Sequence, residues 1–259
     1  ISCYDSLDGA IDLTLLGGAI PYNITWVSSD PTFVDPGTED LSNLDSGSYT
    51  ITVIDDNGCQ YDTTLIIVKP SEIFANGTST DVICFADADG TITLNTSNGV
   101  PTYTWDWTGP GGFTSTDESL TGLDIGTYDV TITDNNGCTK DTSFTINEPP
   151  DINISTVITD VDCNGNGNGT VDATLSGGTA PLTPFWTIIT PGGGLIPAAE
   201  DQNTLDGGVY QLLVTDGNGC ADSVQITINE PDTITSNGIV TDISCYDSLD
   251  GAIDLTLLG

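Results

Sequence analysis

The chain has 259 residues, with thirty-eight Asp and Glu against two Lys, no Arg and no His, and a net charge of −36. Nucleic acids and anionic membranes are bound through Lys and Arg, so neither is expected as a direct partner, whereas cations are. General bases and oxyanion or phosphate clamps are almost absent too, so we do not expect an enzyme. Apolar residues, at 37%, still suffice for folded cores.

The first seventeen residues, ISCYDSLDGAIDLTLLG, return unchanged at residues 243–259. Seventeen identical positions at a period of 242 residues indicate a copying event. We therefore interpret the chain as an excerpt from a tandem array whose two ends fall inside the same unit.

A shorter, degenerate cycle lies inside this unit and is marked by two sets of cysteines. The first set is Cys3, Cys84, Cys163 and Cys245, and the second set is Cys59, Cys138 and Cys220. A first-set Cys is followed by an Asp-Gly or Asn-Gly pair and then by an alternating segment, at residues 10–15, 91–94 and 170–175. A Gly-rich turn with a Pro and an aromatic segment that ends at a Trp come next. After a variable loop, the motif Leu-x-x-Gly-x-Tyr opens another alternating segment that leads to Asp-x-Asn-Gly-Cys, and a last segment stops at Pro70, Pro149 or Pro231.

Period-two alternation, β-branched residues and frequent Asn-Gly turns are typical of an antiparallel sandwich. Leu-x-x-Gly-x-Tyr resembles the tyrosine corner of immunoglobulin-like domains. The predicted fold class is all-β, a tandem array of small immunoglobulin-like β-sandwich domains of about 80 residues, beads in line. The signature aromatics of the core are expected to be Trp26, Trp105, Trp186, Tyr49, Tyr128 and Tyr210.

The expected domains are residues 1–70 (repeat 1 without its first strand), 71–150 (repeat 2), 151–231 (repeat 3) and 232–259 (the start of the next copy of repeat 1). A Pro joins each repeat directly to the next, which restricts bending and stops strand continuation. A stiff array is therefore predicted.

Two cysteines per repeat indicate an oxidised extracellular framework rather than a zinc site, because no C-x-x-C pair or His is present. Pairing within each repeat is preferred: Cys3 with Cys59, Cys84 with Cys138 and Cys163 with Cys220, while Cys245 pairs outside the fragment. Immunoglobulin topology offers a second arrangement, since it places the two cysteines of a repeat at opposite ends of the sandwich. Cys3 would then reach Cys138 and Cys84 would reach Cys220, stapling neighbouring repeats; sequential pairing, such as Cys59 with Cys84, is a third arrangement.

The turns beside the first-set cysteines carry carboxylates and amides with a weak likeness to the start of a calcium loop. Asp and Asn are also good turn formers in their own right. Calcium is the one cofactor considered, and its candidate ligands are Asp5, Asp8, Asp87, Asp89, Asn164, Asn166 and Asn168.

The motifs of each cycle follow a fixed order: Cys, Asp-Gly, an alternating strand, Gly-Gly-x-x-Pro, a strand to Trp, Leu-x-x-Gly-x-Tyr and Asp-x-Asn-Gly-Cys. This ordered set resembles the SprB repeat of Bacteroidota surface proteins. It occurs three times, although the second cycle has Asn98-Gly99 and a shorter segment before Trp105. The resemblance implies very large adhesins, exported by the type IX system, whose cell-surface filaments serve gliding, attachment or contact with other cells, including prey.

The first interpretation is thus a structural stalk segment of an extracellular adhesin filament, with neighbouring repeats, and other copies in a multi-chain fibre, as partners. The alternative makes each domain a carbohydrate-binding module whose aromatic platform would come from Tyr22, Tyr103, Trp107 and Phe113. Glycans or other cell surfaces would then be the partners.

Overall fold

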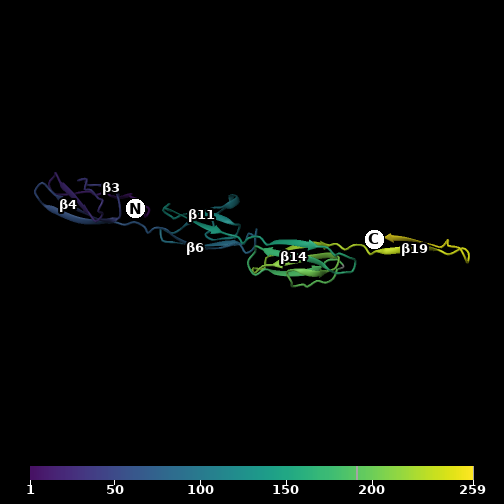
Figure 1. Cartoon of the computed structure of the whole chain (residues 1–259). Coiled ribbons are helices and arrows are strands. Elements are labelled where there is room, and N and C mark those ends of the chain that lie inside the picture. Colours follow the sequence, from purple (N-terminus) through teal and green to yellow (C-terminus); the bar gives the residue numbers. More distant parts are fainter. Residues whose placement is uncertain (191, 259) are drawn as a thin grey trace. The chain divides into compact units, whose positions relative to one another are not determined.

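The computed structural model describes residues 1–190 and 192–258. Within these residues the chain is built of antiparallel β-strands and a single 3-10 turn, η1 (Pro110–Gly112). No helix in the described ranges has the length and apolar character needed to cross a membrane. Figure 1 shows the strands along the chain, which divides into two compact units, residues 1–82 with 88–147 and residues 83–87 with 148–259.

The first unit contains two sandwiches, and the first of them, sandwich 1, packs a two-stranded sheet on a three-stranded one. Its central strand buries Tyr49, Ile51 and Val53, because every second side chain of a strand faces the same side. The strands of sandwich 1 are β1 (Gly9–Ile11) and β3 (Leu41–Leu44), then β2 (Asn23–Ser28), β4 (Gly47–Ile54) and β5 (Gln60–Ile67).

Sandwich 2 packs a three-stranded sheet, in the order β10-β7-β6, on a four-stranded sheet, in the order β12-β11-β8-β9. Its first strand, β6, lies along β7 over seven residues, so β7 has a strand on both sides. The strands are β6 (Phe74–Thr80), β7 (Gly90–Ser97), β8 (Thr104–Thr108), β9 (Thr114–Ser115), β10 (Leu120–Leu123), β11 (Gly126–Thr133) and β12 (Thr139–Ile146).

The second unit contains sandwich 3, with sheets β13-β14-β16 and β15-β17-β18, and a C-terminal hairpin. The sandwich strands are β13 (Asn153–Thr159), β14 (Gly169–Ser176), β15 (Thr183–Ile188), β16 (Gln202–Leu205), β17 (Gly208–Thr215) and β18 (Ala221–Ile228). The hairpin consists of β19 (Thr235–Thr241) and β20 (Ala252–Leu258), whose side chains are all exposed. The domain limits 1–70, 71–150, 151–231 and 232–259 stay a proposal.

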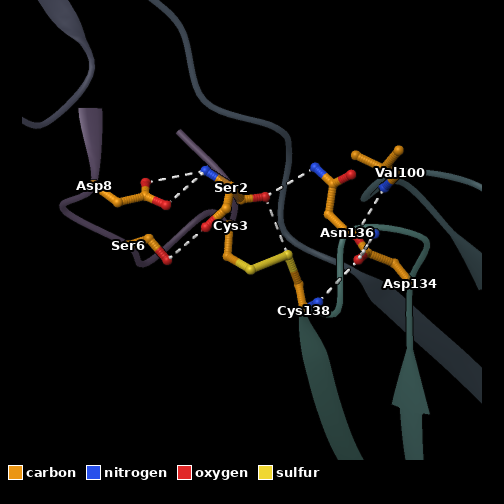
Figure 2. Close-up of a disulfide and its surroundings, with 8 residues drawn as sticks. All are labelled: Ser2, Cys3, Ser6, Asp8, Val100, Asp134, Asn136 and Cys138. Carbon is orange, nitrogen blue, oxygen red and sulfur yellow. Dashed lines mark hydrogen bonds between the residues drawn. A yellow bond between two sulfur atoms is a disulfide. The ribbon is translucent and has the colours of Figure 1, made fainter. Parts of the chain in front are cut away.

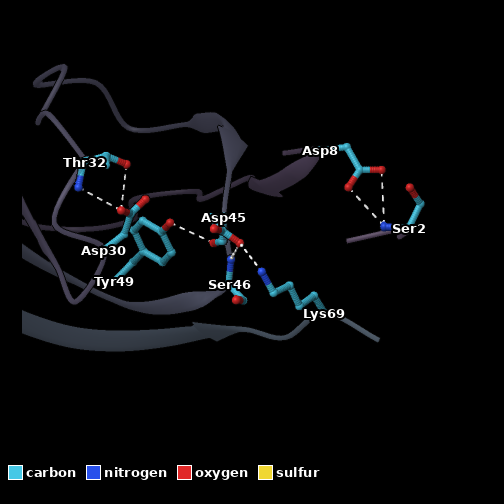
Figure 3. Close-up of polar contacts among 8 residues, drawn as sticks. All are labelled: Ser2, Asp8, Asp30, Thr32, Asp45, Ser46, Tyr49 and Lys69. Atoms are coloured by element: carbon cyan, nitrogen blue, oxygen red, sulfur yellow. Dashed lines mark hydrogen bonds and ion pairs between the residues drawn. The ribbon is translucent and has the colours of Figure 1, made fainter. Parts of the chain in front are cut away.

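The tyrosine corner recurs in each sandwich. The hydroxyl of Tyr49 donates to the carbonyl of Asp45 at 2.9 Å, as Figure 3 shows. Tyr128 donates to the carbonyl of Asp124 at 3.1 Å, and Tyr210 to that of Asp206 at 2.8 Å. Burial raises the pKa of all three phenols, so each stays a proton donor at neutral pH.

The carboxylate of Asp45 also receives the ammonium group of Lys69, at 3.3 Å (Figure 3). The backbone amide of Ser46 is the main reason that the pKa of Asp45 is lowered, and Lys69 adds to the effect. Lys69 lies over the ring of Tyr4, 4.7 Å from its centroid. One of the two lysines therefore ties the first-set cysteine loop, which carries Tyr4, to the start of β4.

One member of the predicted core set is corrected by the structure. Trp26 and Trp186 are 3% and 1% exposed, but in sandwich 2 the residue in this position is Trp107, with 0% exposed, and not Trp105. Trp107 faces Val130 across the sheet, as Trp26 faces Ile51. The indole N–H of each buried Trp donates to a backbone carbonyl: Trp26 to Thr38, Trp107 to Asp117 and Trp186 to Ala199.

Two Trp residues lie in this segment of sandwich 2, and Pro101 stands one position earlier in its turn than Pro21 and Pro181 do. The buried Trp therefore lies six residues after Pro101, but five residues after Pro21 and Pro181. Trp105 is half-buried on the same face of β8, and its indole N–H donates to the hydroxyl of Thr96 at 3.0 Å.

Candidate functional site

The hairpin of the second-set cysteine is organised by the Asp that opens Asp-x-Asn-Gly-Cys. In sandwich 2, one carboxylate oxygen of Asp134 accepts the backbone amides of Asn136, at 2.9 Å, and Cys138, at 3.0 Å. The other oxygen accepts the amide of Val100 at 2.9 Å, from the Gly-rich turn. Asp134 is 5% exposed, and burial alone would raise its pKa, but these amide donors outweigh burial and the pKa is lowered.

The other two sandwiches repeat this arrangement. Asp216 accepts the amides of Asn218, Cys220 and Thr179. Asp55 accepts those of Asn57, Cys59 and Ala19 in the same way. The pKa of Asp216 is lowered mainly by the amide of Thr179, and that of Asp55 mainly by the amide of Ala19. The hairpin motif alone predicts a turn residue at this Asp, and the recurrence of the Asp four residues before Cys59, Cys138 and Cys220 is the sequence signal for its further role.

We expect Asp134→Asn to lower the melting temperature of sandwich 2 by about 5–10 °C, since one acceptor oxygen becomes an N–H donor facing backbone amides. The lowered folded pKa means that the wild-type carboxylate stabilises the fold fully above its unfolded pKa. This contribution is lost as the pH falls below the ordinary value of 3.8 towards the folded one.

Thermal unfolding of the wild type and the variant between pH 7 and pH 2 measures both effects. The wild type should lose more stability than Asp134→Asn below pH 4, because only the wild type has this carboxylate to protonate. The control is Asp129→Asn, an exposed residue of β11 that carries the same change of charge. Equal shifts for the two variants would contradict the role of Asp134.

The first-set cysteine sits in a tight loop that closes on itself. The amide of Ser6 donates to the carbonyl of Cys3 at 3.1 Å, and the amide of Ser2 donates to the carboxylate of Asp8 at 3.0 Å. Hydrogen bonding from Ser2 lowers the pKa of Asp8. The loop thus holds its cysteine at a defined place before β1.

A disulfide joins this loop to the hairpin of the following sandwich. Cys3 is bonded to Cys138, as Figure 2 shows. Their Cα atoms are 5.5 Å apart and their sequence separation is 135 residues. Beside the bond, the side-chain amide of Asn136 donates to the carbonyl of Ser2 at 3.1 Å. The hairpin therefore holds the loop by a covalent bond and a hydrogen bond.

The second unit has the same junction. Cys84 is bonded to Cys220, with the Cα atoms 5.6 Å apart and a sequence separation of 136 residues. The side-chain amide of Asn218 donates to the carbonyl of Ile83 at 3.1 Å, as Asn136 does to that of Ser2. Cys59, Cys163 and Cys245 are free and exposed within the described residues.

These bonds correct the preferred pairing within repeats. The structure does not join Cys3 to Cys59, Cys84 to Cys138 or Cys163 to Cys220, but adopts the second arrangement. The reason is strand length: β1 begins opposite Leu44, just before β4 starts, whereas Cys59 follows the end of β4. Eight residues of strand span about 26 Å, and disulfide geometry requires Cα atoms within about 7 Å.

The predicted calcium ligands lie in the loops of the first-set cysteines, and several of them make hydrogen bonds within or next to these loops. Asn168 accepts the amide of Asp162, in the way that Asp8 accepts the amide of Ser2, and Asn166 donates to the carboxylate of Asp162. Asn164 donates to the carbonyl of Pro231. No group of three or more Cys, Asp or Glu side chains in residues 1–190 and 192–258 could hold a metal ion. Calcium binding through Asp5, Asp8, Asp87, Asp89, Asn164, Asn166 and Asn168 stays a prediction.

The four aromatic residues considered as a glycan platform do not gather on an open face. Trp107 is fully buried, and Tyr22, Tyr103 and Phe113 are half-buried. The hydroxyls of Tyr22 and Tyr103 donate to the carbonyls of Gly17 and Asn98, within their own turns. Phe113 packs edge-on against Tyr128, with ring centroids 5.2 Å apart. These side chains thus serve their own sandwiches.

Antiparallel sandwiches with a tyrosine corner in each define the chain as a tandem array of immunoglobulin-like β-sandwiches. Residues 1–31, 76–112 and 155–183 match the family model of the SprB repeat, so the chain carries SprB repeats, as the sequence motifs predicted. No curated protein matches the chain.

Solved structures with a similar fold come from immunoglobulin-domain proteins, at low identity. The N-terminal eight Ig domains of Down Syndrome Cell Adhesion Molecule are 15% identical, with a TM-score of 0.45 over 81% of this chain and 33% of that one. Sidekick-1 immunoglobulin domains 1–5 are 12% identical, with a TM-score of 0.33 over 92% and 59%. The insect immune protein hemolin is 13% identical, with a TM-score of 0.29 over 92% and 75%. The chain thus spans about a third of the first of these and 59% of the second.

Proposed function

We propose that this chain is a structural stalk segment of a very long extracellular adhesin filament at a bacterial cell surface. The observation that carries the proposal is the pair of disulfides that join the loop of one sandwich to the hairpin of the next. A bond inside a single domain stabilises that domain alone, whereas a bond across a junction transmits tension from one repeat to the next. Such bonds serve a protein that has to bear load along its length.

Three further features support a stalk. The 17-residue repeat at a period of 242 residues fits lengthening by duplication of a module, which increases reach and would be wasteful for a catalytic site. A net charge of −36 keeps an extended chain solvated and opposes unspecific association. Structural disulfides form and persist in oxidising, extracellular surroundings.

The SprB repeats suggest the biological setting. In this proposal the filament is exported by the type IX system and serves gliding, attachment or contact with other cells, including prey. The role is not catalytic, and adhesive specificity lies in parts of the protein other than these sandwiches. Neighbouring repeats are the direct partners of each sandwich.

Immunogold electron microscopy on intact, unpermeabilised cells, with antibody raised against the chain, tests the proposal. Gold particles should recur along filaments that leave the cell, at a spacing set by the module. The same label after permeabilisation, with preimmune serum as a second comparison, controls for internal antigen. Label confined to the envelope or free in the medium would overturn the stalk proposal.

A further inference from the structure

Each disulfide joins two halves that are held in shape by hydrogen bonds of their own. The hairpin of the second-set cysteine is held by the carboxylate of Asp134 or of Asp216. The loop of the first-set cysteine closes through its own backbone, since the amide of Asp87 donates to the carbonyl of Cys84 at 3.2 Å. The reduced chain has seven cysteine thiols, so what remains is to bring the right loop to the right hairpin.

One side chain of the hairpin reaches the loop in the same way at both junctions. The side-chain amide of Asn136 donates to the carbonyl of Ser2, and that of Asn218 donates to the carbonyl of Ile83, each at 3.1 Å. Both acceptors belong to the residue just before the first-set cysteine, and because they are backbone groups, Ser and Ile serve equally. The amide therefore recognises the position of the cysteine and not the identity of its neighbour.

The backbone of the hairpin does not itself require Asn at this position. In each turn the residue with a positive φ is the following glycine, Gly137 at 84° and Gly219 at 91°, whereas Asn136 and Asn218 are not in this region. Such a position in a turn accepts most residues, yet all three hairpins have Asn here, Asn57 included. The recurrence of this Asn therefore points to its side chain.

The second-set sulfur lies against the same carbonyl as the Asn side chain. The sulfur of Cys138 is 3.2 Å from the carbonyl oxygen of Ser2, as Figure 2 shows, and that of Cys220 is 3.5 Å from the oxygen of Ile83. A disulfide sulfur has no proton, but the thiol of the reduced chain can donate to this oxygen. Two groups of the hairpin thus converge on one carbonyl beside the first-set cysteine.

We propose that Asn136 and Asn218 select the partner of each bonded cysteine. In the reduced chain, the side-chain amide docks its hairpin on the carbonyl that precedes the first-set cysteine of the preceding sandwich, and the two thiols then meet. The thiols give two protons and two electrons to a disulfide oxidant, which is reduced to two thiols. Docking favours this pair because held reactants have a higher effective concentration than the other thiols of the chain. The two Asn residues position the bond and take no part in its chemistry.

The test follows reoxidation of the reduced chain with glutathione disulfide at mildly alkaline pH. Samples are trapped at intervals with an alkylating reagent, and their disulfides are mapped by mass spectrometry. In Asn136→Asp the turn keeps a good turn former, but an acceptor replaces the donor. The bond between Cys3 and Cys138 should form about fivefold more slowly, the factor for one lost hydrogen bond. The bond between Cys84 and Cys220, in the same molecule, should form at the wild-type rate.

Asn135→Asp is the matched control, since it adds the same charge one residue earlier in the same turn. The reciprocal variant, Asn218→Asp, should slow the bond between Cys84 and Cys220 and leave the other bond at its wild-type rate. Thermal unfolding of the reduced variants should match that of the reduced wild type. A role in turn stability alone would instead lower the melting temperature and leave the rate of each bond unchanged.

Three results would overturn the proposal. An unchanged rate of formation in Asn136→Asp would show that the amide acts only once the bond exists, even if reduction becomes faster. An equal delay of both bonds would show a general effect on folding, and an equal delay in Asn135→Asp would show an effect of charge. The inference concerns how the junctions are made and does not depend on the stalk function. Its failure would leave the labelling of filaments on cells unaffected.

Discussion

Replacing Trp107 with Ala should destabilise sandwich 2 by about 3–5 kcal/mol, the range for removing a fully buried Trp. The indole fills the core between the two sheets, and its ring lies 6.0 Å from that of Phe144. Its N–H also satisfies the carbonyl of Asp117, which would lose a buried partner. Because a small domain has only a few kcal/mol of net stability, we expect sandwich 2 to be largely unfolded.

Trp105→Ala is the matched control, since it removes the same side chain two residues earlier on the same face of β8. Trp105 is only half-buried, so the loss should be less than half as large. Hydrogen exchange read by mass spectrometry over residues 74–146 measures both, because it separates sandwich 2 from the others. A larger effect of Trp105→Ala would show that the core is centred on the other Trp.

Under tension applied to its two ends, the oxidised chain should extend to about a third of the length of the reduced chain. The reduced chain of 259 residues reaches roughly 880 Å when all sandwiches unfold. With both disulfides intact, the load passes from Cys3 to Cys138 and from Cys84 to Cys220. The shortest covalent path then runs from residue 1 to Cys3, across to Cys138, back along the chain to Cys84, across to Cys220 and on to residue 259. Only the chain segments on this path are stretched, which gives a length of roughly 320 Å.

Single-molecule force spectroscopy with and without reductant measures this difference. The double variant Cys138→Ser and Cys220→Ser should behave like the reduced wild type even without reductant, which controls for effects of the reductant on the fold. Each single variant should lie between the two limits. Equal lengths for the oxidised wild type and the double variant would contradict load transfer through the disulfides.

Local patterns were enough to predict the sandwich fold. Alternation identified β4, β11 and β17, and Leu-x-x-Gly-x-Tyr placed Tyr49, Tyr128 and Tyr210, because both are encoded within a few residues. SprB repeats were identified from the same ordered motifs.

Features that depend on distance across a sandwich or on its neighbours were harder to predict. The disulfide pairing depends on the length of β4, which separates the ends at which Cys3 and Cys59 lie. The three backbone donors that surround Asp134 come partly from the Gly-rich turn, far away in sequence. Residues 252–258 have the same sequence as residues 10–16, but they form the seven-residue strand β20 because β19 pairs with them, whereas β1 ends at Ile11. The same sequence therefore has two structures.

The overlap of the two disulfide loops has a consequence for damage. Cys84 lies inside the loop that Cys3 and Cys138 close, and Cys138 lies inside the loop that Cys84 and Cys220 close. Any single peptide bond between Cys3 and Cys220 can therefore be hydrolysed without the pieces parting, since another covalent route always remains. A protease that nicks one exposed turn would leave the chain of repeats in one piece, and one cut in each of the three stretches 3–84, 84–138 and 138–220 would be needed to separate its two ends.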